Sequence, residues 1–86
     1  MALPFVCMHL LYMATSGSAD PTRASIPLHL AVNGSLEAGQ TAGLILAGDA
    51  TELLKRQARE SIQGLGVPPL RDLFAKARQH DLPIFV

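Results

Sequence analysis

The sequence holds one cysteine and no net charge, and each of these shortages excludes a class of protein. Cys7 is the only cysteine, which excludes an intramolecular disulfide, a cysteine-based zinc site and a C-x-x-C redox pair. Seven basic residues balance seven acidic ones, so the chain lacks the net positive charge that would favour binding to nucleic acid. Hydrophobic residues make up 49% of the chain, which is too apolar for a disordered segment. We therefore expect a folded protein of a reducing compartment, the cytoplasm.

Residues 1–14 contain an apolar run that could be mistaken for a targeting or membrane segment. A secretory signal carries Lys or Arg before such a run, whereas the first such residue here is Arg23. A run of about a dozen residues is also too short to cross a bilayer. We interpret the run as a buried first strand, keep a signal peptide as the alternative, and expect no membrane partner.

A helix is predicted over residues 21–38, after a small polar loop. Asp20 is a favourable N-cap, Pro21 suits the first helical position, and Gly39 supplies the C-terminal stop. Pro27 removes a backbone donor and is expected to kink or restart this helix. The expected inward positions are Leu28, Ala31, Val32 and Leu36.

Residues 41–47 form a short apolar run, typical of a strand that is covered on both faces. A second helix is predicted to begin at Asp49, with Glu52 completing a capping box. Its apolar stripe consists of Leu53, Leu54, Ala58 and Ile62. A third helix has the clearest amphipathic spacing of the chain, with Leu70, Leu73, Phe74 and Ala77 on one side. Residues 82–86 are then a predicted third strand.

This order of elements indicates the fold class. Strands that alternate with helices favour a parallel sheet with right-handed crossovers, here a three-layer α/β/α domain. Eighty-six residues allow one small domain, which we take as residues 1–86.

Several segments together resemble the DsrE-like family. They are residues 20–24 (Asp-Pro-Thr-Arg-Ala), 48–54 (Gly-Asp-Ala-Thr-Glu-Leu-Leu), 66–73 (Gly-Val-Pro-Pro-Leu-Arg-Asp-Leu) and 82–86 (Leu-Pro-Ile-Phe-Val). Their order and spacing extend over about residues 4–86. The resemblance implies a partial DsrE-like α/β domain of the sulfur-relay superfamily, whose members pass persulfide sulfur between cysteines and assemble into oligomers.

The same resemblance implies what this chain does and what it binds. Expected partners are either further copies or related DsrE-like subunits, together with a sulfur-carrier protein, and no cofactor is expected. In the sulfur-carrying branch the reactive cysteine directly follows the strand equivalent to residues 82–86, and this chain stops at Val86. We therefore expect a C-terminally truncated member without catalytic activity. The alternative is a small-molecule or protein-partner binding module without thiol chemistry.

The loops after the first two strands are the candidate binding site. Ligands of parallel α/β sheets bind beyond the carboxyl ends of the strands. Thr15, Ser16, Asp20 and Asp49 are therefore the expected ligand-binding residues, and ordinary helix capping is the alternative role of both aspartates. The chain contains neither G-x-G-x-x-G nor a Walker loop, so nucleotide binding has no motif to support it.

The remaining reactive side chains are expected to be structural. Cys7 lies in the apolar first strand, where a buried, unreactive thiol is the usual case. His9, His29 and His80 match no zinc-ligand spacing, so no metal site is predicted. We expect His29 to stack against the sheet or a subunit partner, and His80 to lie at a helix end.

Overall fold

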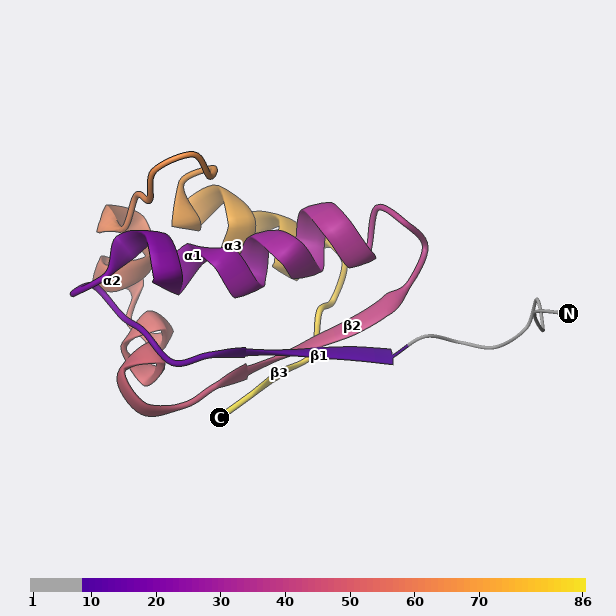
Figure 1. Cartoon of the computed structure of the whole chain (residues 1–86), viewed down its shortest axis with the longest axis horizontal. Helices are drawn as coiled ribbons and strands as arrows, with labels where there is room; N and C mark the ends of the chain where they lie inside the picture. The colour runs from indigo at the N-terminus through magenta and orange to yellow at the C-terminus, as the bar shows by residue number, and fades with distance from the viewer. Residues whose placement is uncertain (1–8) are drawn as a thin grey trace, which may run out of the picture.

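Three parallel strands form the base of the molecule in the computed structural model, which describes residues 9–86 (Figure 1). They are β1 (His9–Ala14), β2 (Thr41–Leu46) and β3 (Ile84–Phe85), in the spatial order β1-β2-β3. Met13 lies opposite Ile45, and Ile45 lies opposite Phe85, so these side chains share one row across the sheet. The prediction of an α/β fold with a parallel sheet is confirmed.

The first crossover is a helix that changes geometry toward its end. α1 (Pro21–Leu30) begins at Asp20, whose Oδ1 accepts a hydrogen bond from the backbone N–H of Arg23 at 3.1 Å. α1 continues through Pro27 rather than restarting there, and passes into the π-helix η1 (Ala31–Ser35). Gly39, with φ of 78°, follows the end of this segment, as expected for a helix stop.

The second crossover contains three helical segments instead of two. A 3₁₀-helix, η2 (Gly48–Leu54), precedes α2 (Arg56–Ser61), and Lys55 between them is extended, with ψ of 132°. The predicted capping box is wrong, because the N-cap of η2 is Ala47 and makes no side-chain hydrogen bond. The predicted stripe also breaks here: Leu54 is 51% exposed. A segment with three residues per turn does not keep the four-residue spacing of an α-helix.

The core lies between the sheet and the helices. α3 (Leu70–Gln79) buries Leu70, Leu73 and Ala77 and packs Phe74 against them, as its spacing predicts. His80 follows at its C-cap, also as expected. The largest fully buried apolar side chains, which come from β2 and from each crossover, are Leu28, Val32, Leu44, Leu46, Leu53, Leu70 and Leu73.

The helices α1, α2 and α3 lie on one face of the sheet, and η2 lies beyond the end of its strands (Figure 1). On the other face, Leu11, Met13 and Phe85 are 64%, 57% and 54% exposed. The expectation that the first strand is buried is therefore wrong for this side of β1. Residues 9–86 form two layers, and the second helical layer of a three-layer arrangement does not occur among them.

Candidate functional site

The carboxyl ends of the strands meet at one edge of the sheet, because all three strands are parallel. Residues 15–20 follow β1, η2 follows β2, and Val86 follows β3. The backbone N–H of Ala47 donates to the carbonyl oxygen of Ala14 at 3.0 Å, which continues the pairing past the end of β2. This edge is where ligands bind in sheets of this kind.

Glu52 joins the two loops at this edge. Its Oε1 accepts a hydrogen bond from the backbone N–H of Ser18 at 2.8 Å, and its Oε2 accepts one from the Ser18 hydroxyl at 2.7 Å. These two hydrogen bonds hold the pKa of Glu52 below its ordinary value of 4.5, and the one from the backbone N–H has the larger effect. The carboxylate is therefore ionised at neutral pH and fastens the loop after β1 to η2.

Gly17 makes this close approach of the loops possible. It is buried, and a Cβ at this position would collide with Oε1 of Glu52 and lie 2.6 Å from the carbonyl oxygen of Asp49. No side chain fits there without moving one loop. Sequence reasoning missed both Gly17 and the true role of Glu52, since the partner of Glu52 lies 34 residues away along the chain.

The four residues predicted to bind a ligand lie in these two loops. Thr15 is exposed and Ser16 is half-buried, directly after β1, and Asp49 is exposed in the first turn of η2. Asp20 lies at the start of α1, where its carboxylate caps the helix and contacts Nε of Arg23 at 3.5 Å. The capping role therefore holds for Asp20 but not for Asp49, and the part of all four in ligand binding stays a prediction.

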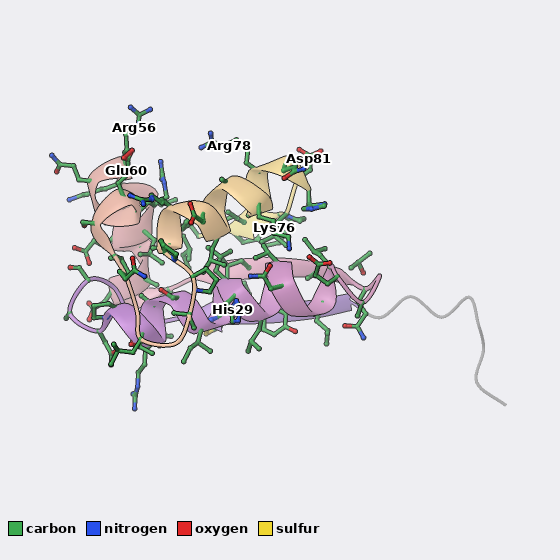
Figure 2. The ribbon with its side chains drawn as sticks, turned by 90° about the horizontal axis from the view of Figure 1, so that it is seen from above. His29, Arg56, Glu60, Lys76, Arg78 and Asp81 are labelled. Carbon is green, nitrogen blue, oxygen red and sulfur yellow. The ribbon has the colours of Figure 1, made fainter. Side chains whose placement is uncertain are left out.

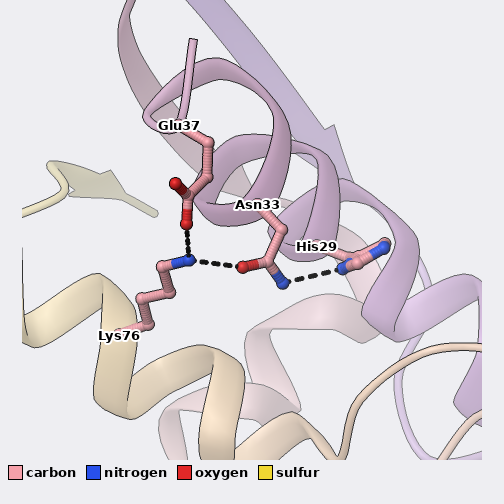
Figure 3. A network of polar contacts seen from close by, with 4 residues as sticks. All are labelled: His29, Asn33, Glu37 and Lys76. Atoms are coloured by element: carbon pink, nitrogen blue, oxygen red, sulfur yellow. Dashed lines mark hydrogen bonds and ion pairs between the residues drawn. The ribbon is translucent and has the colours of Figure 1, made fainter. Parts of the chain in front are cut away.

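A second polar network fastens α3 to the first crossover (Figure 3). The Lys76 ammonium donates to Oδ1 of Asn33 at 2.6 Å and forms a short ion pair with Glu37, which lowers the pKa of that carboxyl. Nδ2 of Asn33 lies 2.9 Å from Nδ1 of His29. Because Lys76 can only donate, the Asn33 amide nitrogen faces His29, and Nδ1 of His29 accepts. His29 is thus half-buried and paired with Asn33.

Metal and thiol chemistry find no support in the part of the chain that the structure describes. Among residues 9–86, no three His, Cys, Asp or Glu side chains lie close enough together to hold a metal ion. Cys7 lies outside the described residues, so its burial stays a prediction. Of the described helices, none combines the length and the apolar character that crossing a membrane requires.

The comparisons with known proteins add no relative to this description. No family model, no curated protein and no solved structure matches the chain. The resemblance to the DsrE-like family therefore depends on the sequence segments given above.

Proposed function

We propose that the chain is a DsrE-like protein of the sulfur-relay superfamily that binds persulfide-bearing partners at the carboxyl edge of its sheet without carrying sulfur on a described residue. The observation that carries the proposal is the convergence of two tied loops at this edge, with Ser16 half-buried and Thr15 and Asp49 exposed beside them. Residues 9–86 contain no cysteine, so no described side chain can form a persulfide.

The proposal includes the setting of the protein. Its partners would be further copies or related DsrE-like subunits together with a sulfur-carrier protein, in the cytoplasm, where thiols remain reduced. The hydroxyls of Thr15 and Ser16 and the backbone amides of Ser16 and Gly17 are the groups that would donate to a persulfide anion. The backbone N–H of Ser18 is not among them, because it donates to Glu52.

The test is an NMR titration of the ¹⁵N-labelled chain with glutathione persulfide and, separately, with glutathione. We expect the persulfide to shift the amide signals of residues 15–20 and of Asp49, and glutathione to shift them much less. Ser16→Ala should weaken the response, whereas Ser61→Ala, a substitution of an exposed serine in α2, should not. Signals that respond equally to both compounds, or that do not respond at all, would refute the proposal.

The alternative is a binding module without thiol chemistry, and one observation favours it. A groove lined by apolar side chains and arginine contains none of the four predicted site residues, and it reaches Leu54 at the end of η2 and Val86 after β3. Mass spectrometry after treatment with a polysulfide tests the unreactive Cys7 that both functions assume. Sulfur added readily to Cys7 in the folded chain would contradict the expectation that this thiol is buried and unreactive.

A further inference from the structure

An open groove runs beside β3, on the face of the sheet that carries the helices. It encloses about 520 Å³, which lies within the range of small-molecule binding sites. Its apolar lining comes from η2, α3 and β3, and from the residues next to β3: Leu54, Phe74, Ala77, Leu82, Ile84 and Val86. We call it the β3 groove.

A smaller hollow between α2 and α3 adjoins the β3 groove and collects positive charge. It encloses about 240 Å³, and four of the chain's seven Lys and Arg side chains line it, namely Arg56, Arg59, Arg71 and Arg78. Glu60 is the one acidic residue of this lining. Figure 2 shows Arg56, Glu60 and Arg78 on the same side of the molecule, over α2 and α3. We call it the arginine hollow.

The two cavities adjoin each other, because Arg59, Phe74 and Arg78 line both. Arg59 is held in place at this boundary. Its guanidinium donates to the carbonyl oxygens of Leu53 at 3.2 Å and Leu54 at 2.8 Å, and lies 5.4 Å from the centre of the Phe74 ring. None of these partners carries a negative charge, so the cation of Arg59 is not neutralised by them.

Little acidic charge compensates the arginine hollow. Within the described residues, its one ion pair joins Arg71 to Asp72 at 3.9 Å, and both side chains are 64% exposed. An ion pair between two such exposed side chains contributes little free energy. In a chain with no net charge, this concentration of arginine is a local feature of α2 and α3, and guanidinium groups suit carboxylate and phosphate ligands.

We propose that the β3 groove and the arginine hollow together bind a small amphipathic anion: one alkyl chain of medium length with a carboxylate head. The alkyl chain lies against Phe74, Leu82 and Ile84 in the groove, and the head lies at Arg59 and Arg78, on the boundary. Asp81 also lines the groove and repels an anion, which places the head on the Arg59 side. This site uses other residues than the proposed function, since neither cavity is lined by residues 15–20 or by Asp49, and Leu54 at the end of η2 is its nearest approach to those loops.

The test is an NMR titration of the labelled chain with decanoate, below its micelle concentration, in comparison with octanoate, decyltrimethylammonium and inorganic phosphate. We expect decanoate to shift the signals of α2, α3 and β3. Two extra methylene groups should make decanoate bind at least about four-fold more tightly than octanoate. The cationic amphiphile and phosphate alone should each bind at least about ten-fold more weakly than decanoate, because each lacks one half of the ligand.

Two pairs of variants test the residues themselves. Arg78→Gln should weaken decanoate binding about five-fold or more, whereas Arg23→Gln, an exposed arginine outside both cavities, should leave it unchanged. Leu54→Gln should reduce the preference for decanoate over octanoate, whereas Leu11→Gln, on the opposite face of the sheet, should not. Circular dichroism confirms the fold of each variant, and Arg59→Gln, at the other arginine that lines both cavities, replaces Arg78→Gln if the latter unfolds.

Three results would overturn the proposal. The first is equal binding of decanoate and decyltrimethylammonium, which would mean that charge has no part. The second is a decanoate response centred on Leu11 and Met13, which would place the alkyl chain on the open sheet face. The third is phosphate binding as tight as that of decanoate, which would leave the groove without a role. None of these results bears on the persulfide titration, so the two sites can fail independently.

Discussion

Substitution of Gly17 by alanine tests whether the two loops at the carboxyl edge are as tightly joined as the structure shows. The added methyl group would collide with Oε1 of Glu52 and lie 2.6 Å from the carbonyl oxygen of Asp49. The Glu52 side chain can turn away, but only at the cost of its two hydrogen bonds to Ser18. The carbonyl of Asp49 belongs to η2 and can yield only if that segment moves.

The expected cost follows from this geometry. Overpacking of a buried position usually costs about 1–3 kcal/mol, and a clash with backbone belongs in the upper half of that range. Alanine also reduces the entropy of the unfolded chain, which returns about 0.4–1 kcal/mol. We therefore expect Gly17→Ala to lower the free energy of unfolding by about 1–2 kcal/mol, which corresponds to a fall of roughly 4–16 °C in Tm for a domain of this size.

The assay is urea unfolding at pH 7, followed by circular dichroism, with an unchanged m-value as evidence that the two states are comparable. Gly34→Ala in η1 is the matched control, because nothing lies within 4 Å of its added Cβ. It should raise the free energy of unfolding by about 0.5–1 kcal/mol, owing to the better helix propensity of alanine. Gly17→Ala in a Glu52→Ala background should still be destabilising, since the clash with Asp49 remains. A Gly17→Ala variant as stable as the parent would refute the reasoning.

Three further predictions concern the clamp at Glu52, the core and the open sheet face. Folding lowers the pKa of Glu52, so the contribution of its carboxylate to stability is present above the ordinary pKa of 4.5 and is lost as the pH falls through the lowered value. The difference in stability between the parent and Glu52→Gln should therefore shrink in acid unfolding titrations. A difference that does not depend on pH would contradict this. Leu73→Ala should cost about 2–5 kcal/mol in urea unfolding, whereas Leu65→Ala, at a position 86% exposed, should change stability by less than about 0.5 kcal/mol, and similar effects of both would be contrary to the packing described here. Sedimentation should show concentration-dependent self-association through the apolar face, reduced by Leu11→Gln together with Phe85→Gln, and a monomer at every concentration would disprove it.

Elements that depend on nearby residues could be predicted from the sequence. α3 follows from a four-residue and three-residue spacing that one helix face satisfies by itself, and three of its four expected inward residues are buried while Phe74 packs against them. The start of α1 follows from Asp20 and Pro21, which act within a single turn. The parallel sheet follows from the alternation of elements, because crossovers of this length leave few other arrangements.

The segment after β2 could not be predicted in the same way. Asp49 followed three positions later by Glu52 is the pattern of a capping box, but the same glutamate can instead accept hydrogen bonds from another loop. The local sequence therefore does not distinguish these two roles. Which of them forms depends on Ser18, which lies in a different loop. η2 is held against the loop after β1, and the extended Lys55 turns the chain before α2 buries Ala58.

The arginine hollow also depends on residues that are distant in the sequence, so it could not be predicted from either helix alone. Each helix by itself shows ordinary solvated arginines outside an apolar stripe, Arg56 and Arg59 on α2 and Arg71 and Arg78 on α3. Packing of the two helices brings all four around one cavity, and Phe74 carries the apolar surface from that cavity into the β3 groove. Solvated arginines do not need an apolar groove beside them, whereas a site for an amphipathic anion needs both the arginines and the groove. The decanoate series distinguishes a solvated surface from a binding site, because solvated arginines would respond to the charge of a ligand but not to the length of its alkyl chain.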